Sequence, residues 1–430
     1  MALKSPVFID VFAGCGGLSL GLMQSGWTGL FAVEHDKNAF ETLSHNLVEE
    51  HAQYRFDWPG WLPKAPASVF DVLKQYHNQI AALEGTVDML VGGPPCQGFS
   101  SAGKRNPADP RNRLVEAYLE FVSVLKPRIV LIENVRGITS DFLESDDRTK
   151  RINYAQYIVE SLDQNYHVST KLIDVSAFGV PQKRHRFFII AARRDCGFED
   201  FAPFAQLEAD RLRFLRDKGI AVVPTTTQMA ISDLEVERNG KGVSRDSVGF
   251  EEIQYSGPIT SYQTIMRSGV PEGIEDTRLA KHRPDIEARF AKFIELCHAE
   301  GRLNKSLSSE LKASFGLKKS AIRVLDPDQP SPTITSMPDD LIHYSEPRTL
   351  TVRENARLQS FPDFFQFRGK YTTGGERRKQ EVPRFTQVAN AVPPLMAEAL
   401  GKMIASALTG FGTTSRTNYQ TARENLTVQL

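Results

Sequence analysis

The stretch Val7-Phe8-Ile9-Asp10-Val11-Phe12-Ala13-Gly14-Cys15-Gly16-Gly17 decides the fold of this 430-residue chain. Its first half is a short apolar run, which predicts a buried strand, and its second half is rich in glycine, which predicts a tight turn. A helix is expected next, from Leu18 to about Ser25. A strand, a glycine turn and a helix in this order are typical of the entrance to a dinucleotide-binding α/β fold.

Apolar strands and amphipathic helices alternate from this stretch to about Arg194. This pattern predicts an α/β domain with a doubly wound, mostly parallel sheet and helices on both of its faces. A helix is expected between Leu114 and Leu125, where apolar residues recur at helical spacing until Lys126-Pro127 ends it. The expected strands cover residues 7–12, 29–34, 86–91, 128–133, 168–175 and 186–192.

The alternation fades after about Asp195, and the sequence becomes mixed and polar up to Glu346. We therefore expect a catalytic and cofactor-binding domain over residues 1–194 and a smaller mixed domain over 195–346. Helices are expected again over residues 348–359 and 393–408, in a segment, 347–409, that returns to the first domain. The tail, 410–430, is rich in polar residues and is expected to be disordered.

Composition narrows the class of protein. Hydrophobic residues make up 41% of the chain, no apolar run is long enough to span a bilayer, and no signal-peptide pattern is present, so a cytoplasmic protein without a membrane partner is expected. The four cysteines form no CxxC pair, which argues against a zinc site and a disulfide framework, and no metal is expected. Basic and acidic residues balance at 52 each, so net charge gives no support for nucleic-acid binding.

The glycine turn has three interpretations. It could be a structural turn without a ligand, or an NAD or FAD site, although the spacing GxGxxG is missing. S-adenosylmethionine fits better, because it carries adenosine but no pyrophosphate. Glu34 ends the next expected strand twenty positions after Gly14, where a carboxylate can bind ribose hydroxyls.

The stretch Val91-Gly92-Gly93-Pro94-Pro95-Cys96-Gln97-Gly98-Phe99-Ser100 places a cysteine in a stiff turn directly after an expected strand. A lone cysteine is more often a small buried hydrophobic residue than a nucleophile. The expected strand 128–133 ends in Glu133, which by itself could equally be a helix cap or part of a salt bridge. Because parallel neighbours bring their carboxyl ends to one edge, Cys96 and Glu133 are expected to converge there.

A thiolate, a carboxyl group and a methyl-sulfonium cofactor together indicate methylation of a pyrimidine carbon. Attack of Cys96 on cytosine C6, with protonated Glu133 bonded to N3, would activate C5 to take the methyl group. Alternation along 182–186 places Arg184 and Arg186 on the same side of an extended segment, from which both could reach this crevice.

The order of the motifs resembles that of the DNA cytosine-5 methyltransferase family, in its compact bacterial or phage modification type. The likeness covers about 6–194 and 348–408 and rests on FAGCGG, PPCQGFS, ENV, QKRHR, RENARLQSFPD and QVANAVPP. It implies that Cys96 is the nucleophile, that Glu133 is the N3 partner, and that Gln182, Arg184 and Arg186 support the base and its backbone. It also implies that a set of residues surrounds S-adenosylmethionine, whose product is S-adenosylhomocysteine: Phe12, Cys15, Gly16, Gly17, Glu34, Asp71, Val72, Pro95, Leu114, Asn390 and Val392.

The resemblance further implies the partners. It predicts a monomer that acts near the nucleoid on a cytosine flipped out of double-stranded DNA, with 195–346 as the target-recognition region. It also predicts that a restriction endonuclease could act on the same site without forming a stable complex. The alternatives are a transfer-RNA cytosine-5 methyltransferase of the same family, a catalytically silent DNA-binding regulator, and an NAD-dependent oxidoreductase. The intact Cys96 and Glu133 and the missing GxGxxG argue against the last two.

Overall fold

The computed structural model describes residues 5–95, 113–143, 151–270, 273–317, 321–373 and 381–410. The chain divides into two compact units. The first unit comprises Met1–Asp174, His185–Arg211 and Met396–Leu430, and the second comprises Val175–Arg184 and Leu212–Leu395. Among the residues described, no helix combines the length and the apolar character that a membrane crossing needs.

A six-stranded sheet forms the centre of the first unit, in the order β2-β1-β3-β4-β9-β7. The first four strands in this order are parallel to one another, whereas β9 is antiparallel to both β4 and β7. This confirms the predicted doubly wound, mostly parallel sheet and adds an antiparallel pair at one side. The strands are β1 (Val7–Val11), β2 (Thr28–Val33), β3 (Met89–Gly92), β4 (Ile129–Val135), β7 (Tyr166–Asp174) and β9 (His185–Arg193).

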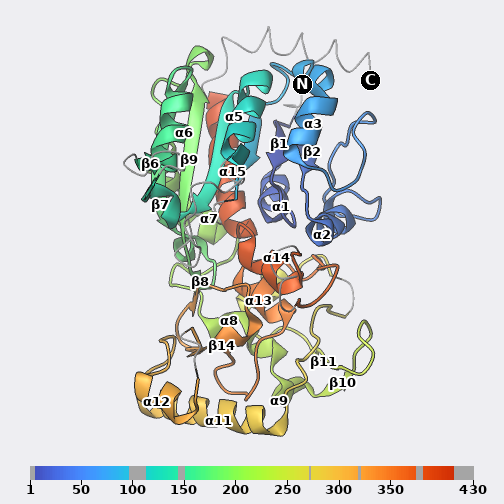
Figure 1. Cartoon of the computed structure of the whole chain (residues 1–430), viewed down its shortest axis with the longest axis vertical. Coiled ribbons are helices and arrows are strands. Elements are labelled where there is room, and N and C mark those ends of the chain that lie inside the picture. The colour runs from blue at the N-terminus through green and yellow to red at the C-terminus, as the bar shows by residue number, and fades with distance from the viewer. Residues whose placement is uncertain are drawn as a thin grey trace. The chain divides into compact units, whose positions relative to one another are not determined.

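Helices cover both faces of this sheet (Figure 1). One face packs against α3 (Val69–Gln75), α4 (His77–Ala81), α5 (Arg113–Leu125) and α6 (Tyr154–Asp163) in a single hydrophobic core. On the other face lie α1 (Gly17–Gln24) and α15 (Pro394–Gly410), and the indole N–H of Trp27, between α1 and β2, donates to the Gly401 carbonyl of α15. Strands buried on both faces read as nearly continuous apolar runs, which is why the sequence pattern disclosed them.

Most other elements of the first unit are short. The expected helix 114–125 corresponds to α5, and it ends where Lys126 takes a positive φ of 44° before Pro127. The remaining elements are α2 (Lys37–Leu47), η2 (Arg136–Thr139), β5 (Asp141–Leu143), β6 (Arg151–Asn153), η4 (Arg194–Cys196) and α7 (Pro203–Asp217), the last of which continues into the second unit.

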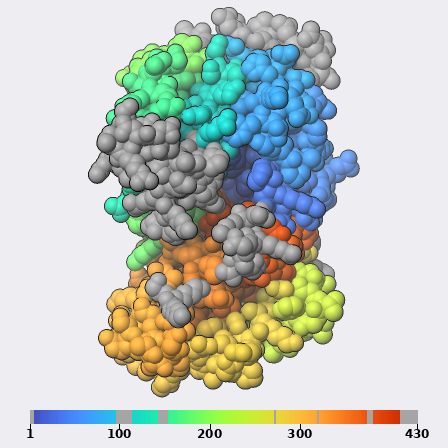
Figure 2. Space-filling model, viewed as in Figure 1, coloured from blue at the N-terminus to red at the C-terminus, as the bar shows by residue number. Residues whose placement is uncertain are grey.

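The second unit mixes short helices and very short strands. Its surface in Figure 2 is built largely by the yellow and orange part of the chain, which includes α11 (Pro284–Ala299) and α12 (Ser309–Ser314). Its other helices are η3 (Val175–Phe178), α8 (Thr227–Ile231), η5 (Ser232–Leu234), α9 (Val236–Asn239), α10 (Ser261–Met266), η6 (Pro338–Asp340), α13 (Val352–Leu358) and α14 (Arg384–Asn390). Its strands are β8 (Gln182–Lys183), β10 (Lys241–Val243), β11 (Glu251–Ile253), β12 (Arg323–Val324), β13 (Ser331–Pro332) and β14 (Leu341–Ile342).

The division into units differs from the predicted one in the segment 347–409. Residues 347–395, including α13, group with the second unit, and only the chain from Met396 onward groups with the first. The physical reason lies in α13, whose Arg357 is fully buried and contacts Asp233 and Asp363, both of the second unit. Cys96, the loop that follows it and the expected tail beyond residue 410 lie outside the described residues.

Candidate active site

Three strands meet at one edge of the sheet of the first unit. β3 and β4 are parallel, with Gly92 beside Ile132, so their carboxyl ends lie together. β9 is antiparallel to β4, with Arg186 beside Val135, so β9 begins where β4 ends. The turn that leads to Cys96, the carboxylate of Glu133 and the guanidinium of Arg186 therefore all belong to this edge.

Glu133 and Arg186 form a buried ion pair at this edge. Their side chains are only about a tenth exposed, and the Arg186 Nε lies 2.8 Å from Glu133 Oε1. Apart from this contact with Arg186, Oε1 has no hydrogen-bond partner among the described residues. Burial lowers the pKa of Arg186, while the adjacent Glu133 carboxylate opposes that shift. A buried carboxylate oxygen without a donor is uncommon, and it leaves a position at which a ligand can bind.

The turn after β3 is fixed against the end of β4. The Asn134 side-chain amide donates to the Pro94 carbonyl over 3.0 Å, and its oxygen accepts from the Val135 N–H. A Cβ on Gly93 would lie 3.2 Å from Glu133 Oε2, which is closer than an ordinary van der Waals contact. Asn134 was not among the predicted site residues, although it directly follows Glu133 in the ENV motif. Cys96 itself lies outside the described residues; the described chain stops at Pro95, which is half-buried.

The glycine turn after β1 is a strained loop closed by Glu34. Phe12 has a φ of 66°, which is rare for an aromatic residue, and Gly14 and Gly16 also have positive φ. Glu34 Oε2 accepts from the Gly14 N–H over 2.8 Å, and Oε1 accepts from the N–H of Asp36. Burial is the main cause that raises the pKa of Glu34, and these backbone donors oppose it.

Cys15 and the two glycines beside it shape the turn. Cys15 is 2% exposed, and burial raises the pKa of its thiol to about 12, so it stays protonated. Gly16 has a φ of 95°, which favours glycine, and a Cβ there would also lie 2.7 Å from the end of the Leu47 side chain. Gly17 is buried and opens α1.

The remaining predicted cofactor residues of the first unit lie on helices. Asp71 and Val72 occupy the first turns of α3, but they differ in exposure: Asp71 is exposed, whereas Val72 is 2% exposed and packs in the core. Leu114 is half-buried near the start of α5 and contacts the same core. Of these three, Asp71 has the accessible polar side chain.

Four predicted site residues belong to the second unit. Gln182 is fully buried, and its amide bonds the Ile334 N–H, the Leu358 carbonyl and the Gln359 side chain. Arg184 is 1% exposed and donates to the Ala389 carbonyl over 2.6 Å. Asn390 is exposed at the end of α14, and Val392 is buried after it. The structure thus brings Glu133 and Arg186 together, and assigns Gln182 and Arg184 to bonds within the second unit.

The chain shares both fold and family with known methyltransferases. Its fold is the Rossmann-like fold of S-adenosylmethionine-dependent methyltransferases. The sequence model of the family described as C-5 cytosine-specific DNA methylase matches residues 7–406. The chain therefore belongs to this family and is a DNA (cytosine-5) methyltransferase.

The relatives are similar over nearly their whole length. The chain is 30% identical over 410 residues to the Type II methyltransferase M.DdeI of Desulfomicrobium norvegicum, covering 92% of this chain and 88% of that one. It is 29% identical over 463 residues to the Type II methyltransferase M.AgeI of Thalassovita gelatinovora, covering 93% and 99%. A solved DNA modification methyltransferase encoded within a prophage of E. coli superposes with a TM-score of 0.61 at 23% identity, covering 94% and 100%, and this likeness supports the fold.

The family implies S-adenosylmethionine as the methyl donor, and the glycine turn fits it. Residues 12–17 include no basic side chain that would select a phosphate. A Cβ on Gly14 would meet no atom within 4 Å, so the turn offers open space rather than a filled contact. The carboxylate of Glu34 closes this turn, and each of its oxygens has more than one lone pair with which to accept from ribose hydroxyls.

Proposed function

We propose that this chain transfers a methyl group from S-adenosylmethionine to C5 of a cytosine flipped out of a specific sequence of double-stranded DNA. The observation that carries the proposal is the buried Glu133, whose Oε1 lacks a hydrogen-bond donor at the edge where the turn to Cys96 begins. A cytosine presents N3 and the N4 amino group side by side, and a carboxyl group can bond both. The pyrimidine ring cannot enter this edge from within a stacked duplex, so the base must leave the stack.

Cys96 is the proposed nucleophile. Its thiolate adds to cytosine C6, and Glu133 in its protonated form hydrogen-bonds N3, so that the electron pair of the C5–C6 bond becomes available at C5. S-adenosylmethionine supplies the methyl group to C5. The C5 proton then leaves to water, the C5–C6 double bond re-forms, and the thiolate of Cys96 is released.

The other residues of the edge hold these groups in place. Arg186 fixes the Glu133 carboxyl group from one side, and Asn134 ties the end of β4 to the Pro94 carbonyl, two residues before Cys96. Positioning of this kind matters because displacement of a catalytic group by about 1 Å can cost a factor of about 100 in rate. Glu34, Phe12, Asp71, Leu114, Asn390 and Val392 are the proposed cofactor contacts, together with Cys15, Gly16, Gly17, Val72 and Pro95.

The relatives that bear the name Type II methyltransferase favour DNA over transfer RNA as the substrate. We infer that the chain modifies the sites that a restriction endonuclease of the same specificity would cut, and that it does so in the cytoplasm, where the chromosome lies. The second unit, which includes most of the region 195–346, is the proposed target-recognition unit.

Duplex DNA that carries 5-fluorocytosine tests this function, because fluorine at C5 cannot leave as a proton. With S-adenosylmethionine present, we expect a covalent protein–DNA adduct that survives denaturation, and Cys96→Ser is expected to abolish it. Bisulfite sequencing of DNA from cells that express the chain would first define the modified site. Trapping that persists in Cys96→Ser, or methyl transfer to transfer RNA and not to duplex DNA, would contradict the proposal.

A further inference from the structure

Arg278 lies on a short extended segment of the second unit that continues the β10–β11 sheet. The Ile253 N–H donates to the Thr277 carbonyl, and the Leu279 N–H donates to the Glu251 carbonyl over 2.8 Å. Arg278 itself forms an antiparallel bridge with Glu252. The backbone of Arg278 is therefore fixed, because the residues before and after it both bond to β11.

The guanidinium of Arg278 is held between two aromatic rings. Its Cζ lies 4.1 Å from the centre of the Phe250 ring and 3.6 Å from the centre of the Tyr371 ring. Arg384 also stacks on Tyr371, at 4.1 Å, and two guanidinium groups cannot share one ring face at these distances, so Tyr371 lies between them. Stacking restrains the plane of the Arg278 guanidinium, while its edge stays free to donate.

Arg278 has no carboxylate within ion-pair distance among the described residues, unlike four other arginines of this unit. Arg348, Arg353, Arg357 and Arg384 each contact at least one. The nearby Asp246 carboxylate is taken by Arg384 and by the Tyr371 hydroxyl. The Nε of Arg278 is buried without a hydrogen-bond partner, and burial lowers the pKa of its guanidinium. A half-buried guanidinium with an unpaired N–H gains from a ligand that accepts its N–H groups.

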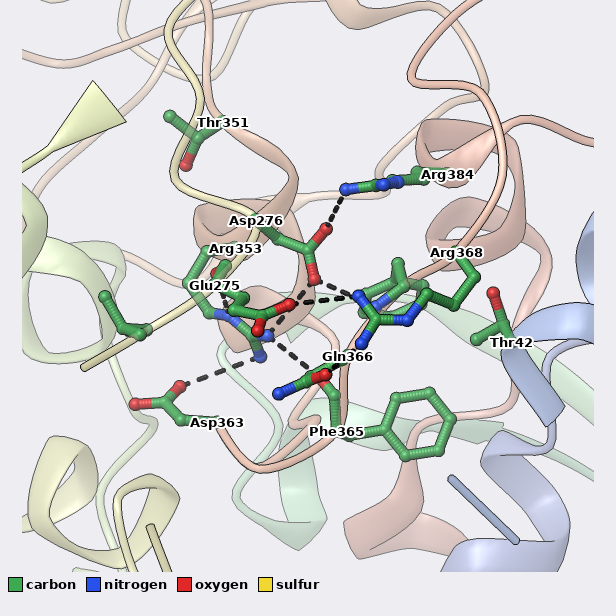
Figure 3. A network of polar contacts seen from close by, with 12 residues as sticks. Thr42, Glu275, Asp276, Thr351, Arg353, Asp363, Phe365, Gln366, Arg368 and Arg384 are labelled. Atoms are coloured by element: carbon green, nitrogen blue, oxygen red, sulfur yellow. Dashed lines mark hydrogen bonds and ion pairs between the residues drawn. The ribbon is translucent and has the colours of Figure 1, made fainter. Parts of the chain in front are cut away.

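A rigid network supports the segment that enters Arg278. Asp276, two residues earlier, has a φ of 66°, which non-glycine residues rarely adopt. Its carboxylate accepts from Arg353 and Arg384 and from the Phe367 N–H, as Figure 3 shows for the two arginines. These bonds hold the backbone of Asp276 in the strained conformation. They therefore also fix the backbone that leads from Asp276 to Arg278.

We propose that Arg278 reads a guanine of the recognition sequence, with its guanidinium edge donating to guanine O6 and N7 in the major groove. This inference rests on the proposed function, since it assigns to the second unit a base that it recognises. A guanidinium of fixed plane matches the paired acceptors of guanine, which is the commonest specific contact between proteins and DNA. A phosphate can also accept two hydrogen bonds from a guanidinium, but mobile lysines contact phosphates as well, so a phosphate contact does not require a fixed plane. Val248, on the loop that leads to Phe250, is fully exposed, as an apolar contact to a neighbouring base would require.

The test replaces each guanine of the recognition site singly by 7-deazaguanine, which lacks the N7 acceptor. For the unchanged enzyme, kcat/KM is expected to fall about 5- to 150-fold at one guanine. Arg278→Met keeps a side chain of similar length between the two rings but has no N–H donor. On unmodified DNA, Arg278→Met is expected to lose as much activity as the unchanged enzyme loses on the substituted site. At that one guanine, 7-deazaguanine is expected to cause no further loss in Arg278→Met, whereas its response at the other guanines stays the same. Arg278→Lys keeps the charge and is expected to recover only part of the loss.

Arg283→Ala serves as the matched control, because Arg283 is exposed and pairs only with the exposed Asp285 among the described residues. It removes one positive charge from the same unit and is expected to respond to every substitution as the unchanged enzyme does. Thermal unfolding of each variant would show whether Arg278→Met alters folding. If it does, the 7-deazaguanine series on the unchanged enzyme and on Arg278→Lys still decides the question.

Three outcomes would overturn the inference. In the first, the unchanged enzyme tolerates 7-deazaguanine at every guanine of the site. In the second, Arg278→Met is as sensitive to 7-deazaguanine as the unchanged enzyme at every guanine. The third is a uniform loss on all DNA with a weaker salt dependence, which would indicate a phosphate contact. If the proposed function itself is wrong, the result is distinguishable from these three, because the unchanged enzyme then methylates no duplex DNA at all.

Discussion

Glu133 of the first unit and Asp276 of the second are both less than a tenth exposed and both contact arginine, yet their bonding differs. Both oxygens of Asp276 accept hydrogen bonds, from two arginines and one backbone N–H. Glu133 has one arginine beside it, and its Oε1 has no hydrogen-bond partner in the part of the chain that the structure describes. A carboxylate with complete bonding holds the fold, whereas one with a missing donor is available to a substrate.

The arginines of the second unit repeat this contrast. Arg357 donates to Asp363 through Nε and Nη2 and to Asp233 through Nη1 and Nη2, and its side chain is fully buried. Arg278 is stacked between two rings, and its Nε has no hydrogen-bond partner among the described residues. The second unit therefore contains a network of arginines and aspartates that bond one another. It also contains one arginine, Arg278, that can still bind a ligand.

The largest effect is expected from Glu133→Gln. Glutamine keeps the shape of the side chain but cannot give up a proton to N3, so kcat/KM is expected to fall by a factor of about 100 to 10,000 while the Kd for DNA changes little. Single-turnover methyl transfer and a DNA-binding titration would measure the two quantities separately. Glu116→Gln, on the exposed side of α5, is the control. Equal rates for the Glu133 and Glu116 variants would remove Glu133 from the chemistry.

Arg357→Met is expected to lower the free energy of unfolding of the second unit by about 3–5 kcal/mol. The variant leaves the carboxylate of Asp233 buried without its arginine, and burial already raises the pKa of Asp233 while Arg357 opposes that shift. Urea unfolding at pH 7 would measure the loss.

Arg368→Met provides the comparison for this measurement. Arg368 pairs with Glu275, and both are partly exposed, so the cost is expected to be below about 1 kcal/mol (Figure 3). If Arg357→Met and Arg368→Met lower the free energy of unfolding by similar amounts, burial does not determine how much an arginine of this network stabilises the unit.

The sequence predicted most of the first unit because its strands are apolar runs separated by helices. All six expected strands are present, with bounds within a few residues. The pattern could not show that β9 runs antiparallel to β4, because strand direction is not encoded in the alternation of apolar residues. That direction is what brings the start of β9, and hence Arg186, to Glu133.

The second unit was predicted less completely. Arg353 and Arg357 bind aspartates 77 and 124 positions away, and no local pattern reveals such partners. The helix that carries them was expected at the right residues, but it groups with the second unit and not with the first. Alternation also placed Arg184 beside Arg186, but the extended segment is interrupted at Arg184, between β8 and β9. Arg184 belongs to the second unit and donates to the Ala389 and Ala391 carbonyls of that unit.

Asp10 extends the comparison to a carboxyl group that has no ion pair among the described residues. It is fully buried on β1, accepts from the Ser19 hydroxyl, and has no partner for Oδ1. Burial raises its pKa to about 7, the Ser19 hydrogen bond opposes this, and the nearby Glu34 adds to it. The folded protein therefore keeps a proton that the unfolded chain has already lost by neutral pH, since an unperturbed aspartate titrates near 4.

The sign of the effect follows from linkage. The stability that protonated Asp10 contributes is complete below about pH 4 and is lost as the pH rises through about 7. Asp10→Asn is therefore expected to be more stable than the unchanged protein at both pH 5 and pH 8, and its advantage is expected to be about 2–3 kcal/mol larger at pH 8. Urea unfolding at both pH values would measure this, with the exposed Asp200→Asn as control. If Asp10→Asn changes stability equally at pH 5 and pH 8, Asp10 is ionised in the folded protein throughout, and an incompletely bonded carboxyl group in this unit does not require a proton.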